Sequence, residues 1–128
     1  MARIFVFLGA LNGLLAVALG AYASHGLRHR LSDRMLDGFQ IGVDYQGLHA
    51  LALLATGLLM LHIPGSRWGR VSGWLFLLGI CLFSGSLYAL ALFGGSGLGV
   101  ITPIGGMTLL AGWLALAIAG FKDVPRAG

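Results

Sequence analysis

Three long intervals without a charged side chain constrain this chain most strongly. Residues 4–27, 45–66 and 71–121 contain no Asp, Glu, Lys or Arg. A helix needs about 20 apolar residues to cross the roughly 30 Å hydrocarbon core of a bilayer. Intervals of 24 and 22 residues fit one crossing each, and the third interval, of 51 residues, fits two. The sequence therefore predicts an all-α membrane protein built as a bundle of four transmembrane helices.

Composition argues against a water-soluble domain. Charged residues make up 9% of the 128 residues and hydrophobic residues 58%, whereas soluble domains carry roughly 25% charged residues. The net charge of +4 comes from scattered side chains rather than from a basic face, so we expect no nucleic-acid partner. Membrane lipid is the expected surrounding.

We predict a single integral membrane domain over residues 1–128. Its spans are expected near residues 4–23, 45–63, 71–93 and 101–121. The glycine-rich segment 94–99 supplies a turn inside the longest interval, and Pro64-Gly65 ends the second span. The N-terminus also resembles a secretory signal peptide, with Ala21-Tyr22-Ala23 as a cleavage site. Because three further spans follow, we expect this segment to be retained as the first span.

The segment between the first two spans has the pattern of an amphipathic helix. Apolar residues recur every four positions, at Leu27, Leu31, Met35, Phe39 and Val43, and charged residues occupy the other faces. We predict an interfacial helix near residues 29–44 that lies flat on the lipid surface. Ser32 or Asp33 would cap its N-terminus. Since no proline separates it from the second span, one continuous helix is the alternative.

Orientation follows from the distribution of Lys and Arg at the ends of the spans, because the cytoplasmic side usually carries more of them. One side holds Arg3, Arg67, Arg70, Lys122 and Arg126, and the other holds Arg28, Arg30 and Arg34. This distribution predicts a multi-pass protein of the cell inner (plasma) membrane with both termini in the cytoplasm.

Polar side chains inside membrane spans are site candidates, because burying them in hydrocarbon is costly. Tyr45, His49 and Thr56 share one face of the second span, with Gln46 close by. Side chains from the first and third spans are expected to meet this face. The predicted polar pocket contains Asn12, Tyr45, Gln46, His49, Ser84, Ser86 and Tyr88. For His49 a structural hydrogen bond, proton handling or ligand contact, and metal binding all remain open.

The search for catalytic chemistry finds little. The chain has no Gly-rich phosphate loop, HExxH, CxxC or Gly-x-Ser-x-Gly motif, so we assign no catalytic residue and expect no cofactor. His25 and His29 are four residues apart, a spacing that suits metal ligands on a helix, yet no third ligand is evident. No metal site is predicted. No acidic residue falls inside a predicted span.

Glycine pairs spaced four residues apart indicate close helix packing. They occur at Gly9 and Gly13, at Gly69 and Gly73, and at Gly95 and Gly99. Small residues let two helices approach closely in a membrane. Such faces serve either the packing of one four-helix chain or contact with further subunits.

Four sequence blocks resemble a known family. They are LGAYASHGL at 19–27, YQGLHALALL at 45–54, FSGSLY at 83–88, and ITPIGG at 101–106 with Gly112-Trp113. Together they resemble the small membrane proteins called domain of unknown function 423, to which the animal transmembrane protein 256 is similar. The resemblance implies a four-span bacterial-type inner-membrane protein and supplies no reaction. The departures from the usual pattern are Tyr22, Ala23 and Ser24. The resemblance directs attention to the polar residues within its blocks, which are His25, Tyr45, Gln46, His49, Ser84, Ser86, Tyr88 and Thr102. Of these, His25 and Thr102 are interfacial candidates, together with His29 outside the blocks.

Three functional hypotheses follow. The leading one is a non-enzymatic accessory or scaffold subunit that packs with lipid, as a homo-oligomer or within a larger membrane complex. The second is a small proton-linked transporter or permease with a polar pocket around His49. The third is an intramembrane metal-dependent enzyme that uses His25 or His49.

Overall fold

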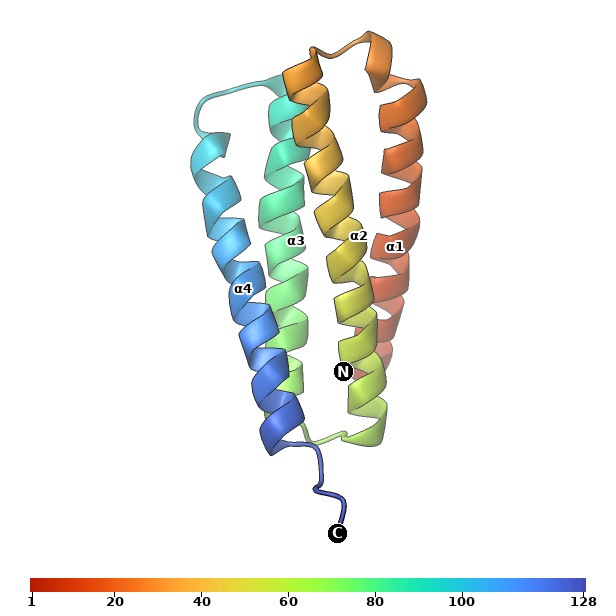
Figure 1. The fold of residues 1–128 in the computed structure, drawn as a ribbon, viewed down its shortest axis with the longest axis vertical. Coiled ribbons are helices and arrows are strands. Elements are labelled where there is room, and N and C mark those ends of the chain that lie inside the picture. Colours follow the sequence, from red (N-terminus) through yellow and green to blue (C-terminus); the bar gives the residue numbers. More distant parts are fainter.

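The computed structural model describes all 128 residues and is helical throughout. Its four long helices are α1 (Ala2–His25), α2 (Asp33–His62), α3 (Arg67–Phe93) and α4 (Leu98–Lys122), and a short 3-10 helix, η1 (Leu27–His29), follows α1. Successive helices run in opposite directions, up and down the long axis of the molecule (Figure 1). The all-α prediction is confirmed.

Three of the helices are long and apolar enough to cross a membrane. They are α1 together with the turn after it, α3 and α4. Large apolar side chains on the helices point outward: Val17 is 76% exposed, Leu51 66% and Met107 67%. A soluble monomer rarely exposes apolar surface on this scale, so the outer face of the helices suits a lipid surrounding.

The structure corrects the boundaries predicted between the first two spans. Residues 33–62 form one uninterrupted helix, so no separate interfacial helix near 29–44 precedes a span that starts at Tyr45. Phe39 and Val43, which belong to the predicted apolar face, are buried in a cluster with Ala23, Leu27 and Ala91. Because α1, η1 and α3 supply these neighbours, the first turns of α2 pack within the bundle.

The caps and turns at the helix ends are local features, and two of them match the sequence. The Ser32 hydroxyl accepts a hydrogen bond from the backbone N–H of Met35 at 3.3 Å, which is the expected N-cap of α2. Gly94 and Gly95 have φ values of +71° and +110°, a backbone conformation that favours glycine. These two residues make the turn between α3 and α4 that the sequence predicts.

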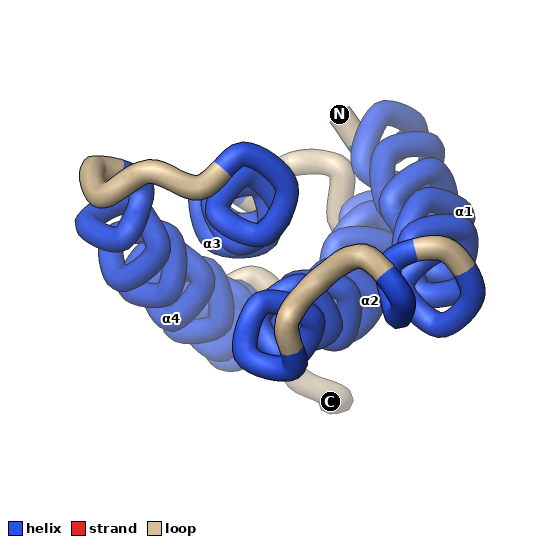
Figure 2. Tube along the Cα trace, turned by 90° about the horizontal axis from the view of Figure 1, so that it is seen from above, coloured by secondary structure: helices blue, strands red, loops and turns tan.

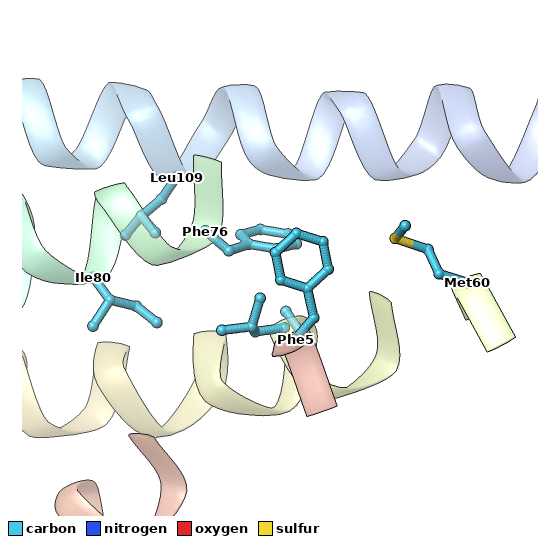
Figure 3. Packing of buried hydrophobic residues seen from close by; sticks show 7 residues of the cluster. Phe5, Met60, Phe76, Ile80 and Leu109 are labelled. Atoms are coloured by element: carbon cyan, nitrogen blue, oxygen red, sulfur yellow. The ribbon is translucent and has the colours of Figure 1, made fainter. Parts of the chain in front are cut away.

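The packing order follows the chain, since α1 packs on α2, α2 on α3, and α3 on α4. Viewed along the bundle, α2 and α3 occupy the middle while α1 and α4 lie on opposite sides (Figure 2). Phe5, Met60, Phe76, Ile80 and Leu109 belong to the main apolar cluster, to which all four helices contribute (Figure 3).

Glycines set the closest approaches between helices. A Cβ atom built on Gly9 would lie 2.7 Å from the backbone nitrogen of Leu54, and one on Gly105 would lie 2.4 Å from that of Phe83. Real Cβ atoms do not approach this closely, so these positions hold α1 against α2 and α3 against α4. Gly13 and Gly99, by contrast, have open space around them.

Candidate functional site

A buried amide at the centre of the bundle joins three helices. The Gln46 side chain donates from Nε2 to Asn12 Oδ1 at 3.0 Å, and its Oε1 accepts from the Tyr88 hydroxyl at 2.6 Å. Asn12 in turn donates from Nδ2 to the carbonyl of Leu8 at 2.9 Å. Gln46 is only 4% exposed. The predicted meeting of side chains from α1, α2 and α3 is therefore present here as a continuous hydrogen-bond chain.

His49 is the centre of a second set of polar contacts, in which both ring nitrogens are hydrogen-bonded. Its Nδ1 lies 2.7 Å from the carbonyl oxygen of Tyr45, and its Nε2 lies 3.0 Å from the indole Nε1 of Trp113 on α4. A carbonyl oxygen only accepts, so Nδ1 carries the proton, and an indole N–H only donates, so Nε2 is the acceptor. This pairing specifies one neutral tautomer of the imidazole.

Aromatic rings surround this histidine. Tyr45 stacks on His49 with ring centroids 5.9 Å apart, and Trp113 meets it edge-on at 5.9 Å. Phe76 lies 5.8 Å away on the side of α3. His49 is 3% exposed, so the imidazole is enclosed by these aromatic rings and by its two hydrogen-bond partners.

A groove of about 460 Å³ runs beside these rings, between α2, α3 and α4. Tyr45, His49, Phe83, Pro103 and Trp113 are among the residues that line it. Asn12, Gln46 and Tyr88 do not line the groove. The seven predicted pocket residues thus do not share one cavity, and only Tyr45 and His49 border this groove.

The predicted serines tie neighbouring helices together. Ser84 donates from Oγ to the carbonyl of Gly42 on α2 at 2.7 Å. The hydroxyls of Ser86 and Thr102 lie 2.6 Å apart and join α3 to α4. Thr102, expected at the interface, is therefore half-buried and paired.

Thr56 bonds to its own helix, because its hydroxyl donates to the carbonyl of Ala52 at 2.8 Å. Throughout the chain, no buried side-chain nitrogen or oxygen lacks a hydrogen-bond partner. The buried polar side chains therefore make their hydrogen bonds within the bundle.

Comparison with known proteins places the chain in a family. The family described as protein of unknown function (DUF423) matches residues 19–106, which include Gln46, His49 and Ser84. The chain belongs to the DUF423 family. It is 42% identical over 120 residues to the UPF0382 membrane protein YwdK of Bacillus subtilis, a match that covers 94% of this chain and 98% of that protein.

Other relatives agree with this assignment. A UPF0382 membrane protein of Staphylococcus epidermidis is 46% identical over 122 residues, covering 94% of this chain and 97% of the relative. One from Haemophilus influenzae is 44% identical over 119 residues, covering 93% and 94%. No solved structure matches the chain. These relatives are named membrane proteins, which agrees with the apolar outer surface of the helices.

The two histidines of this DUF423 protein that were predicted at the interface do not form a site with a third ligand. His25 at the end of α1 and His29 at the end of η1 are both exposed. Nowhere in the chain do three His, Cys, Asp or Glu side chains gather as metal ligands would.

Two contacts between residues far apart in the chain escaped prediction from the sequence. Trp113 bonds to His49 across 64 positions of the chain. Asp123, just past α4, accepts from the Ser66 hydroxyl at 2.6 Å and from the Trp68 backbone N–H at 3.2 Å, and so caps α3. A serine before a helix is a recognisable cap signal, but nothing in the sequence indicates which acid would join it.

Proposed function

We propose that this DUF423 protein is a four-span inner-membrane protein that acts as a non-enzymatic accessory or scaffold subunit, packing with lipid or within a larger membrane complex. The observation that carries the proposal is the complete pairing of buried polar side-chain atoms within the chain. A transport path or an active site needs polar groups that are free to meet a substrate. Here these groups instead stabilise the contacts between helices.

The fourth span in this proposal is α2. Three helices qualify as spans by length and composition alone. α2 lies antiparallel to α1 and α3 (Figure 1) and contacts both. The polar residues Gln46, His49 and Thr56 lower the mean hydropathy of α2. Because all three side chains are buried against protein, they do not face lipid. Neighbouring helices thus support the crossing of α2.

The proposed orientation places both termini in the cytoplasm. The end of the bundle that holds the α2–α3 connection and both termini carries five of the eight basic residues, and the end with η1 carries Arg28, Arg30 and Arg34. The outer end would then include η1 and the first turns of α2 near the headgroups. Reporter fusions to the two termini and to the 94–97 turn test this topology.

A second candidate function is transport of a small apolar or amphipathic solute through the groove between α2, α3 and α4. The groove itself favours it, since His49 and Tyr45 border an opening of about 460 Å³. The two hydrogen bonds of His49 count against a proton-linked cycle, because the ring would have to break the Trp113 contact to take a proton at Nε2. Solute flux into proteoliposomes that is unchanged by His49→Ala would remove this histidine from any transport step.

Native mass spectrometry of the protein taken directly from its membrane tests the scaffold proposal. We expect the chain in an assembly with further chains, or with lipid that survives activation in the gas phase. A bare monomer, with neither lipid nor a reproducible partner, would refute the proposal.

A further inference from the structure

One face of α2 has no partner in the bundle. Its residues are Asp37, Ile41, Asp44, Leu48, Leu51 and Ala55, all exposed, and we call this face the outer α2 stripe. The spacing alternates between four and three residues. This is the spacing of a seam along which two helices pack against each other.

Asp44 is the unusual member of the stripe because of its depth. Gly42 is level with Ser84, to which its carbonyl is hydrogen-bonded, and Ser84 lies about 13 Å before the apolar end of α3 at Phe93. Val43 packs on Gly20, about 5 Å before the apolar end of the first span at Ala23. Measured along α1, Asp44 therefore lies roughly 6 Å inside the apolar end of that helix; measured along α3, it lies roughly 16 Å inside. The second span predicted from the sequence starts one residue later, at Tyr45, and so does not include Asp44.

The Asp44 carboxyl group has little support from its own chain. It accepts one hydrogen bond at Oδ1, from Gln40 Nε2 at 2.9 Å, and its neighbours along the stripe, Ile41 and Leu48, are apolar. Ionisable side chains at such depth usually face protein or water and pair with another group. Gln40 is the only side chain that donates to Asp44, so a second donor or a cation for this outward-facing carboxylate has to come from outside the chain.

We propose that the outer α2 stripe is the docking face for a transmembrane helix of another membrane protein, and that this helix places a Lys or Arg opposite Asp44. The inference rests on the proposed function, which it extends by naming the face and the chemistry of the partner. The apolar members Leu48 and Leu51 supply packing, and the charge pair selects the partner and its register.

Charge decides between this partner and a second copy of the chain. Two copies related by an axis along the membrane normal would place Asp44 opposite Asp44, and Asp37 opposite Asp37. Arg34 is the nearest Lys or Arg on α2, about 15 Å along the helix from Asp44. No Lys or Arg lies between positions 35 and 66. A basic helix from a different protein is the complementary occupant.

Synthetic peptides test the charge pair. The probes are transmembrane peptides of leucine and alanine with Lys at the central position, compared with peptides that carry Leu or Glu there. The protein, labelled with a donor fluorophore at the exposed Cys81, is reconstituted in phosphatidylcholine vesicles with acceptor-labelled peptide. We expect the Lys peptide to bind about tenfold more tightly than the Leu peptide, and Asp44→Asn to abolish this difference.

Asp33→Asn is the matched control, since Asp33 lies at the outer end of α2 and its substitution leaves the depth of Asp44 unchanged. Unchanged helicity by circular dichroism verifies that each variant folds. Equal binding of the Lys and Leu peptides, or retention of the preference in Asp44→Asn, would overturn the inference. Energy transfer between two labelled copies of the protein that Asp44→Asn abolishes would also overturn it, because a second copy would then cover the stripe.

Photo-crosslinking in cells separates this inference from the proposed function. A photoreactive residue at Leu51 is expected to capture a second protein in an Asp44-dependent manner, whereas one at Leu14, exposed on α1, is not. Capture of a partner at Leu14 and not at Leu51 would refute the docking face and leave the scaffold proposal standing. Native mass spectrometry showing a lipid-free monomer would refute both.

Discussion

Trp113→Phe is the sharpest perturbation of this fold. The substitution keeps an aromatic ring beside His49 and Phe76 but removes the indole N–H that lies 3.0 Å from His49 Nε2. Hydrogen bonds between helices in membranes contribute about 0.6 to 1.7 kcal/mol, and an unpaired buried acceptor costs about 1–3 kcal/mol. We expect the free energy of unfolding to fall by about 2 kcal/mol, a factor of roughly 30 in the unfolding constant.

Reversible unfolding in bicelles by steric trapping measures this change. Trp74→Phe is the matched control, because the Trp74 ring packs edge-on against Phe5 at 5.4 Å and is 44% exposed. A double-mutant cycle with His49→Phe isolates the pair, and we expect a coupling energy of about 1 kcal/mol. Solid-state nitrogen NMR should show the His49 proton on Nδ1.

Two results would refute the reasoning. A cycle with no coupling between positions 49 and 113 would mean that the hydrogen bond does not hold α2 to α4. A proton on Nε2 of His49 would mean that the Tyr45 carbonyl and the Trp113 indole do not define the tautomer. Either result would return His49 to the transport hypothesis as a group free to exchange a proton.

Three further substitutions test other contacts in the same unfolding assay. Gln46→Leu leaves Asn12 and Tyr88 without their shared partner, and we expect a loss of about 2–3 kcal/mol; a loss below that of Tyr88→Phe would contradict the central position of the amide. Gly105→Ala would separate α3 from α4 and lower stability by about 1–3 kcal/mol, while Gly99→Ala, in open space, should leave it nearly unchanged. Asp123→Ala removes a cap of α3 and should cost about 1 kcal/mol, which an unaltered midpoint would disprove.

The arrangement of the polar residues bears differently on the scaffold and transport hypotheses. The groove beside Tyr45 and His49 is compatible with transport, whereas the Asn12–Gln46–Tyr88 hydrogen-bond chain lies outside that groove. A shared pocket of all these residues would have favoured a polar ligand site. Their division into separate interhelical contacts favours a protein that holds helices in place and acts through its outer surface.

The properties that the sequence determined by itself are local ones. A long stretch without charged residues favours a lipid surrounding independently of which helices pack against it. The apolar spans of α1, α3 and α4 could therefore be predicted. Ser32 caps α2 and Gly94-Gly95 turns the chain because each acts on a backbone within a few residues of itself. Membership of the DUF423 family could also be predicted from the sequence, since its blocks are short local stretches of the chain that need no tertiary contact to be recognised.

Tertiary structure alone decided which polar groups meet. Gln46 and Asn12 are 34 positions apart, Ser66 and Asp123 57, and His49 and Trp113 64. Such pairs depend on the rotation and axial shift of each helix, which the close contacts at Gly9 and Gly105 set. The outward position of Asp44 has the same origin, because burial against neighbours decides which face of a helix remains free. The sequence left open whether residues 29–44 form a separate helix, and the burial of Phe39 and Val43 against neighbouring elements accompanies the continuous α2.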